Sequence, residues 1–286
     1  MNKKVQKILV YVAWSLTIVS MLTLLGFANN ALDEKPCTQI EVNIDNIDEH
    51  DFIKNDDVFN MLKEKNKKLK GEAMGNIDVA SLERMLNANS HIANAEVYKT
   101  IGGAIKINIK TKRPIARIIN YKGESFYLDE DGYLMRWSNN YTANLPVFTG
   151  DIYESYDVCY KINYSKVDIN DSLLIKNNLF GIYSLAKYLD SNEFWKAQIE
   201  QIYIGKEVEL VPLAGSHIIV FGNFQNIEEK MNKLLVFYKH GLNKVGWNVY
   251  ETINLKYKDQ IVCTRASAAQ GYKSQLSKNK VTAISH

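Results

Sequence analysis

The sequence predicts an α+β fold with three parts: a single N-terminal transmembrane helix, a small domain, and a larger mixed β-sheet domain with two main helices. The residues 8–27 carry no charge. Hydrophobic periodicity over residues 39–111 gives the order strand, helix, helix, strand, strand. After residue 113, short apolar runs are separated by turn residues, as in an antiparallel sheet. A mixed composition, 46% apolar and 23% charged over 286 residues, suits one large domain or two small ones.

The apolar segment begins at Ile8, contains Trp14 and ends at Phe27. Its length is about that of a helix crossing roughly 30 Å of hydrocarbon. A cleaved signal peptide is the alternative, because Ala28 or Ala31 could lie near a cleavage site, but the apolar run exceeds the usual length. We therefore favour an uncleaved membrane anchor.

Charges beside this segment predict its orientation. Lys3, Lys4 and Lys7 precede it, whereas Asp33 and Glu34 follow it. The positive-inside rule then leaves a short cytoplasmic tail and places everything after Phe27 across the membrane. The predicted parts are a tail over 1–7, the membrane helix over 8–27, a linker over 28–38, a first domain over 39–112, a second domain over 113–265 and a flexible tail over 266–286.

The first domain has clear helix and strand signals. A strand over 37–45 precedes a helix over 55–69, which Asn55 or Asp56 would cap. A second helix begins after Asp78, and a pair of strands follows, joined through Gly102 and Gly103. In the last strand Ile105, Ile107 and Ile109 alternate with polar residues, which predicts one buried and one wet face. On the second helix Val79, Leu82 and Leu86 face the core, and the outer face carries Ser81, Glu83 and Arg84 without any reactive grouping.

The second domain begins with hairpins that turn at Lys122-Gly123 and Asp131-Gly132. A helix over 172–189 and strands over 199–204, 207–212 and 216–221 follow. We expect Asn226 and Glu229 to form a capping-box variant at the start of another helix, and Gly241 to end it. Strands over 248–257 and 260–265 complete the domain.

No pattern for catalysis, a cofactor or a metal occurs. P-loop, dinucleotide-binding, nucleophile-elbow and zinc motifs are all lacking from the sequence, and basic residues are interspersed with acidic ones, so nucleic acid is not an expected partner. His91 and His217 have no nucleophile beside them and are interpreted as structural. Among the cysteines only Cys159 and Cys263 are a conceivable pair, and three unpaired thiols are the simpler interpretation.

Two charged clusters have alternative interpretations. Asp129 and Asp131 mimic the start of a calcium loop, but the twelfth position is Asn140 where a bidentate Glu is needed, so a hairpin turn is favoured. The lysine cluster from Lys63 to Lys70 would contact anionic lipid or an acidic partner, or simply form a solvated helix face.

The order and spacing of several segments resemble the FtsQ/DivIB family of cell-division proteins. These segments are a basic tail, one apolar helix, "KTKRPIARI", "FYLDEDGYLMRW", "LPVFTG", "HIIVFG" and "INLKYKDQIV". The resemblance covers nearly all of residues 3–265. It implies that the first domain is a POTRA domain and the second is the β domain of that family.

The resemblance also implies a non-catalytic scaffold in the bacterial inner membrane, at the division septum. Its expected partners are bitopic FtsB- and FtsL-like proteins, together with FtsK and FtsW/FtsI-like components, and no cofactor is expected. Positions matching the FtsB-binding strand are Leu255, Lys256, Tyr257, Gln260, Ile261, Val262 and Cys263. A recruitment surface on the POTRA domain would include Glu83, Arg84, Glu96 and Tyr98.

A terminal strand often lies at a sheet edge, where it recruits another chain or is covered internally. Gln260–Cys263 is therefore the best candidate for a binding edge, and coverage by the C-terminal tail is the alternative. A second function, from a different class, is a membrane-anchored cell-envelope hydrolase or sugar-binding protein that uses the Asp129/Asp131 turn. A third is a POTRA-type export component, although the chain lacks the pattern of a membrane barrel.

Overall fold

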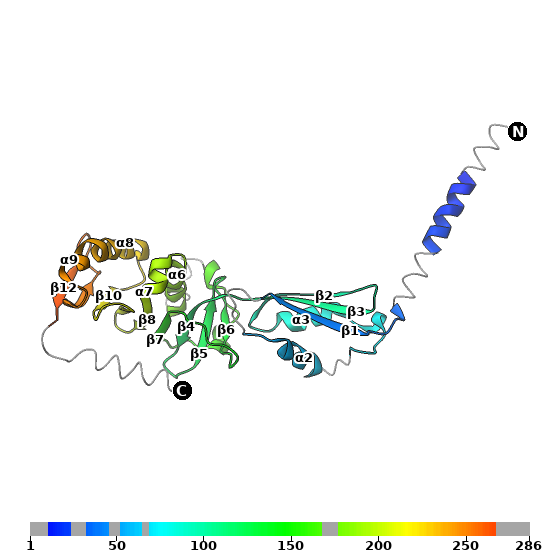
Figure 1. The fold of residues 1–286 in the computed structure, drawn as a ribbon, viewed down its shortest axis with the longest axis horizontal. Coiled ribbons are helices and arrows are strands. Elements are labelled where there is room, and N and C mark those ends of the chain that lie inside the picture. The colour runs from blue at the N-terminus through cyan, green and yellow to red at the C-terminus, as the bar shows by residue number, and fades with distance from the viewer. Residues whose placement is uncertain (1–10, 24–32, 46–51, 65–68, 168–176, 267–286) are drawn as a thin grey trace. The chain divides into compact units, whose positions relative to one another are not determined.

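The computed structural model describes residues 11–23, 33–45, 52–64, 69–167 and 177–266 (Figure 1). The chain forms two compact units, Met1–Thr111 and Lys112–His286, and each has a hydrophobic core of its own. Both units combine helices with a β-sheet. The predicted α+β class is confirmed for these two units.

Only part of the predicted membrane segment is described, as a helix over 11–23 in which Trp14 is exposed. Ile8 and Phe27 lie outside the described residues. Within the described parts of the chain, no helix combines the length and the apolar character needed to cross a bilayer. The membrane span therefore stays a prediction.

The first unit has the predicted order of elements. They are β1 (Gln39–Asp45), α2 (Asn55–Glu64), the 3-10 turn η2 (Met74–Asn76), α3 (Val79–Asn87), β2 (Ile92–Lys99) and β3 (Ala104–Thr111). The strands form a sheet in the order β1-β3-β2, with β1 parallel and β2 antiparallel to β3. Because side chains alternate along a strand, Ile105, Ile107 and Ile109 all point into the core. Leu82 and Leu86 of α3 are fully buried in the same cluster.

In this unit the cap predicted for α3 is present, whereas the cap predicted for α2 is not. Asp78 accepts a hydrogen bond from the backbone N–H of Ser81 at 3.0 Å, as predicted for α3. The prediction that Asn55 or Asp56 caps α2 is wrong. The Asp57 carboxylate instead accepts from the Lys54 N–H at 2.8 Å, since a carboxylate at the third helical position can reach back to the residue before the helix.

The second unit contains a nine-stranded mixed sheet in the order β12-β11-β10-β9-β8-β7-β4-β5-β6. The strands are β4 (Pro114–Ile119), β5 (Ser125–Asp129), β6 (Leu134–Arg136), β7 (Val147–Gly150), β8 (Ile199–Ile204), β9 (Val208–Pro212), β10 (Ile218–Gly222), β11 (Tyr250–Asn254) and β12 (Val262–Arg265). The helical elements are α4 (Tyr156–Cys159), η3 (Tyr164–Lys166), α6 (Asn178–Asp190), α7 (Glu193–Gln198), α8 (Ile227–Phe237), η4 (Tyr238–Leu242) and α9 (Asn243–Val245). Parallel pairs lie at β4–β7, β7–β8 and β10–β11, so the predicted mixed sheet is confirmed.

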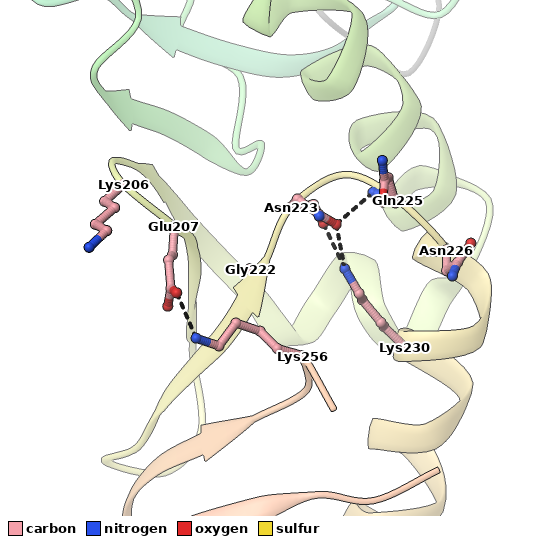
Figure 2. Close-up of a pocket in the computed structure, with 8 residues that line it drawn as sticks. All are labelled: Lys206, Glu207, Gly222, Asn223, Gln225, Asn226, Lys230 and Lys256. Carbon is pink, nitrogen blue, oxygen red and sulfur yellow. Dashed lines mark hydrogen bonds and ion pairs between the residues drawn. The ribbon is translucent and has the colours of Figure 1, made fainter. Parts of the chain in front are cut away.

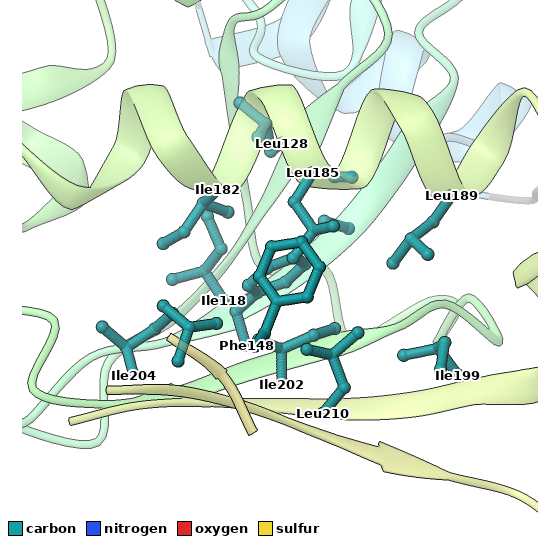
Figure 3. Close-up of a cluster of buried hydrophobic side chains, with 14 of the residues drawn as sticks. Ile118, Leu128, Phe148, Ile182, Leu185, Leu189, Ile199, Ile202, Ile204 and Leu210 are labelled. Carbon is teal, nitrogen blue, oxygen red and sulfur yellow. The ribbon is translucent and has the colours of Figure 1, made fainter. Parts of the chain in front are cut away.

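The core of the second unit lies between α6 and the sheet. Figure 3 shows Ile182, Leu185 and Leu189 of α6 pointing toward the sheet. Phe148 of β7 and Ile202 of β8 meet them there, and all five side chains are fully buried. Burying such side chains contributes roughly 1.5–3 kcal/mol each.

Two helices of this unit differ from the prediction. α6 begins at Asn178, where the Asn177 side chain caps the Leu179 N–H at 2.8 Å, and residues 172–176 of the predicted helix lie outside the described residues. Asn226 precedes α8 in a left-handed conformation (φ 53°) and makes no side-chain cap, so the predicted capping box is wrong.

Gly241 does not end α8, contrary to prediction. The helix passes into the π-helical turn η4 and then into α9, which ends before Gly246. The wider turn keeps Tyr238 and Leu242 buried in the core after Leu234. Gly246, with φ 101°, takes the conformation that favours glycine after a helix.

Arg113 fastens the first residues of the second unit to α6. Its guanidinium donates two hydrogen bonds to Asp190, at 2.6 and 3.0 Å, and two to Glu130, at 2.8 and 3.0 Å. Burial alone would raise the pKa of Asp190, but hydrogen bonds from Arg113 and Lys196 hold that pKa below its ordinary value. The ion pair therefore favours the charged, folded state.

Replacing Arg113 with Met should lower the free energy of unfolding by about 3 kcal/mol at neutral pH, because Asp190 stays buried without its bidentate partner. The Asp190 contribution is fully present above the unfolded carboxyl pKa of about 3.9 and is lost as pH falls through the lower folded value. Wild type and variant should thus converge in acid, measured by denaturant unfolding across pH. Lys196→Met, which removes the more exposed partner of Asp190, is the control and should cost less than about 1 kcal/mol. Equal losses in the two variants would contradict this assignment.

Gly150 permits the parallel pairing of β7 with β8. Its φ is 108°, and a Cβ atom there would overlap the carbonyl group of Ile204, with which Gly150 is in register. Asp151 N–H donates to that same carbonyl at 2.6 Å. Neither the backbone angle nor the space therefore admits a side chain.

Gly150→Ala should destabilise the protein by at least about 3 kcal/mol, since it adds a clash with main chain to left-handed strain. Gly123→Ala is the matched control, because Gly123 also has a positive φ, 81°, but open space where its Cβ would lie. It should cost only about 1 kcal/mol. Thermal unfolding of both variants measures the difference, and similar melting temperatures would show that Ile204 does not constrain Gly150.

Candidate functional site

β12 is the outermost strand at one end of the nine-stranded sheet. Among the described residues it pairs with β11 alone, in antiparallel register. Val262 and Thr264 are exposed, and Cys263 is half-buried against the core. The edge position expected for the last strand is confirmed, and residues 267–286, the predicted covering tail, lie outside the described residues.

The backbone direction shows which groups of β12 face outward. Ala266 N–H donates to the carbonyl of Val249 at 3.0 Å, toward β11. Since N–H groups alternate along an antiparallel strand, those of Thr264 and Val262 point the same way. The N–H groups of Cys263 and Arg265 then point to the free edge, where a further strand can accept their hydrogen bonds.

Hydrogen bonds from α8 anchor the start of the segment between β11 and β12. The Lys233 ammonium of α8 donates to the carbonyls of Leu255, at 3.2 Å, and Tyr257, at 2.6 Å. Asp259 occupies the left-handed region (φ 57°), which an Asp tolerates better than most residues. Tyr257 is 46% exposed and so remains available to a partner.

The structure separates the seven residues predicted for partner binding by their exposure. Leu255 is buried in the core, so its side chain is not accessible to a partner. This corrects the prediction for Leu255, because the local sequence does not indicate that the side chain is buried. Lys256, Tyr257, Gln260 and Val262 are exposed, whereas Ile261 and Cys263 are half-buried. All seven lie on one continuous strip of chain around the β11–β12 turn.

A surface pocket of about 390 Å³ lies beside this strip (Figure 2). It is lined by Lys206 and Glu207 of the β8–β9 turn, by Gly222, Asn223, Gln225, Asn226 and Lys230 at the β10–α8 junction, and by Lys256. The Lys256 ammonium contacts the Glu207 carboxylate at 2.6 Å, which raises the pKa of Lys256. Lys230 donates to the backbone and side-chain oxygens of Asn223 at 2.9 and 3.0 Å, and partial burial lowers its pKa.

Sequence reasoning missed this pocket. Its residues come from three stretches, around 206, 222–230 and 256, that only the folded sheet brings together. Lys256 was the sole member within a predicted binding segment. No local motif marks the other residues.

The predicted POTRA recruitment residues have different roles in the structure. The Glu83 carboxylate accepts a hydrogen bond from the Val97 N–H of β2 at 2.8 Å. Arg84, Glu96 and Tyr98 are exposed, and the last two share the solvent face of β2. Glu83 is therefore engaged within the domain, which its position on the outer helix face did not indicate.

Asn87 completes this cover over the β2 edge. Its side chain accepts from the Ala95 N–H at 2.9 Å and donates to the Ala95 carbonyl at 3.2 Å. Together with Glu83, it satisfies outward main-chain groups of β2 from α3. A strand protected in this way is not open to strand addition along these residues.

The Asp129/Asp131 turn is a hairpin, as predicted. Asp129 is 2% exposed, and its carboxylate accepts from the N–H groups of Asp131, at 3.1 Å, and Tyr133, at 2.7 Å. Lys112 pairs with the same carboxylate at 2.9 Å. Burial raises the pKa of Asp129 and Lys112 opposes that rise. Asp131 is exposed, and its backbone N–H is bonded to the Asp129 carboxylate within the turn.

The other polar candidates are structural where the chain is described. His217 is buried, with Nε2 2.7 Å from the Tyr238 hydroxyl, and His91 stacks on Phe52. Cys37, Cys159 and Cys263 are free thiols. Over the described ranges, no group of three or more His, Cys, Asp or Glu side chains is placed to hold a metal ion. Of the lysine cluster, Lys65, Lys67 and Lys68 lie outside the described residues.

The structure combines a three-stranded α+β domain with a nine-stranded mixed sheet whose last strand, β12, has one neighbouring strand among the described residues. These features define a two-domain α+β protein. Comparison with protein families assigns both domains. Residues 35–110 match a model of the POTRA-like domain, and residues 113–264 match the model described as FtsQ/DivIB, C-terminal related. The second match spans more than half of the 286 residues, and the chain belongs to this FtsQ/DivIB family. No curated protein matches the chain.

Both parts of the resemblance drawn from the sequence, FtsQ/DivIB and POTRA, are thereby confirmed. The family is one of cell-division proteins that generally have no enzymatic activity. Its domains indicate a scaffold in cell division rather than a catalyst.

The cover over β2 can be tested on α3. Glu83→Ala combined with Asn87→Ala should speed hydrogen exchange at Val97 and Ala95 at least tenfold, because both amides lose their acceptors. Hydrogen-exchange mass spectrometry of the β2 segment gives the measurement. Arg84→Ala, on the same helix but exposed, should leave exchange unchanged. Unchanged protection in the double variant would mean that these side chains do not shield the edge.

Proposed function

We propose that this protein is a non-catalytic, single-pass scaffold of the bacterial divisome in the inner membrane. Its short N-terminal tail would lie in the cytoplasm and its two folded domains in the periplasm, at the division septum. The uncharged run 8–27 and the lysines before it support this topology. Membership of the FtsQ/DivIB family supports the role in division.

The β12 edge is the proposed binding site for an FtsB- or FtsL-like bitopic protein. The observation that carries this proposal is a terminal strand whose Cys263 and Arg265 N–H groups face outward. Strand addition supplies affinity through main-chain hydrogen bonds, and alternate side chains supply specificity. Binding there would help to recruit and regulate septal peptidoglycan synthesis.

The POTRA domain is the proposed contact for other divisome components, of the FtsK or FtsW/FtsI type. Its accessible surface includes Arg84, Glu96 and Tyr98. With the β2 edge occupied by Glu83 and Asn87, such contact would use side chains on the solvent face of β2 rather than strand addition to it.

Proline at Cys263 should abolish partner binding while leaving the domain folded. It removes an N–H that faces the free edge and spares the hydrogen bonds to β11. Cys263→Ala is the matched control, because it also removes the thiol but keeps the backbone N–H. With a photoreactive residue at Tyr257 of the full chain in dividing cells, the adduct to a small bitopic coiled-coil protein should fall at least tenfold only in the proline variant.

Thermal unfolding of both Cys263 variants provides the folding control. An undiminished adduct in a folded proline variant would contradict strand addition at β12. Capture of an export or outer-membrane component by the wild type would overturn the divisome role.

A further inference from the structure

The turn between β2 and β3 of the POTRA-like domain presents an apolar side chain to solvent. Ile101 in this turn is 86% exposed, the largest exposed fraction among the bulky apolar side chains of the described residues. The turn is closed by hydrogen bonds, because the Thr100 N–H donates to the Ala104 carbonyl at 2.8 Å and the Thr100 hydroxyl accepts from the Ala104 N–H at 3.0 Å. A single exposed apolar residue is common on proteins, so its location decides whether it has a role.

The N-terminal segment of the domain runs along this turn. The Lys35 ammonium donates to the Ile101 carbonyl at 3.1 Å, and the Thr38 N–H donates to the Gly103 carbonyl at 2.8 Å. Gly103 has a φ of 86°, and a Cβ atom there would lie 3.2 Å from the Pro36 carbonyl oxygen. This stretch of chain is therefore fastened to the turn.

The same segment is also fastened on its other side, to the loop before α3. The Met74 N–H donates to the Lys35 carbonyl at 2.9 Å. A Cβ atom at Gly75 would lie 3.0 Å from the Cβ of Asp33, so the chain already contacts the domain at that residue. The linker that precedes the domain thus ends at Asp33.

Few residues separate this end of the domain from the predicted membrane segment. The uncharged run ends at Phe27, and Asp33 is the sixth residue after it. Residues 28–32 lie outside the described residues, but bond lengths limit the span of six residues to about 22 Å. The β2–β3 turn, fastened to the segment that begins at Asp33, is thereby confined close to the membrane surface. The start of β2, at Ala93, lies about 20 Å along the strand from Lys99.

We infer that the β2–β3 turn docks end-on against the bilayer that holds the chain's own anchor, with Ile101 entering the interface. The inference rests on the single-pass topology of the proposed function and adds a contact between the POTRA-like domain and lipid. A lipid bilayer is the occupant because the short linker keeps this end of the domain beside it. Tethering makes the contact intramolecular, so one apolar side chain suffices where a free domain would need a larger surface.

The charges around the turn and the fastened segment balance. The basic side chains are Lys35, Lys70 and Lys99, and the acidic ones are Asp33, Glu34 and Glu72. Lysine stems can cover apolar surface while their ammonium groups stay among lipid phosphates. We therefore expect docking to depend on the burial of Ile101 and only weakly on the net charge of the lipid.

A fluorophore on the turn of the full chain tests the inference. Gly102→Cys places it beside Ile101, since Gly102 is exposed and a Cβ atom there makes only an ordinary contact with Thr100. Ala93→Cys, exposed near the start of β2, is the matched position at the far end of the strand. Cys263→Ala removes the one cysteine that is not buried, which confines labelling to the new site.

Each labelled protein is reconstituted into phosphatidylcholine vesicles that contain a nitroxide-bearing lipid, which quenches fluorophores at the interface. The label at Gly102 should be quenched at least about fivefold more strongly than the label at Ala93, because only the turn reaches the boundary between headgroups and acyl chains. Adding phosphatidylglycerol should change this ratio less than about twofold.

Substitution of Ile101 gives a second readout. Ile101→Ser should reduce quenching at Gly102 about fivefold, because it removes the apolar group that enters the interface. Ile101→Leu keeps an apolar side chain of the same size and should retain the quenching. Since Ile101 is exposed, both variants should keep the melting temperature of the wild type. Undiminished quenching in Ile101→Ser would overturn the inference.

The other outcomes separate this inference from the proposed topology. Equal quenching at Gly102 and Ala93 would show that the domain lies along the bilayer and would overturn end-on docking. No quenching at either position, in a chain that alkaline carbonate does not extract from the vesicles, would overturn docking and leave the single-pass anchor intact. Extraction of the chain would overturn the anchor itself and docking with it. Quenching only in the presence of phosphatidylglycerol would overturn apolar insertion in favour of charge.

Discussion

Every backbone N–H and C=O group in a sheet needs a hydrogen-bond partner, and an outermost strand has a neighbour on one side only. The two domains meet this constraint differently. In the POTRA-like domain, Glu83 and Asn87 of α3 satisfy the outward groups of β2. In the larger domain, β6 is an edge of only three residues, whereas β12 keeps outward amides beside an exposed turn. The same requirement that closes one edge makes the other suited to a partner strand.

The environment of β12 would limit the entropy lost if a partner strand were added there. Lys233 fixes the carbonyls on both sides of Lys256, and Leu255 is anchored in the core. Ile261 and Cys263 pack partly against the same core. A strand that is already extended would lose less conformational freedom on pairing, so more of the hydrogen-bond energy would contribute to affinity.

The predictions that the structure confirms rest on patterns among residues close together in the sequence. Ile105, Ile107 and Ile109 alternate with polar residues, and Lys122-Gly123 and Asp131-Gly132 mark hairpins through glycines with positive φ. Each such signal depends on neighbours along the chain. Contacts between distant residues were inaccessible to the same rules: Glu83 bonds to Val97 across a helix–strand interface, and Lys256 meets Glu207 from 49 positions away. The cap expected at Asn226 failed because its backbone adopts the left-handed conformation at the β10–α8 junction.

Main-chain pairing alone gives limited discrimination, since any extended peptide offers the same N–H and C=O groups. For a strand added at β12, discrimination would therefore have to come from exposed side chains beside the edge, such as Tyr257, Gln260 and Val262.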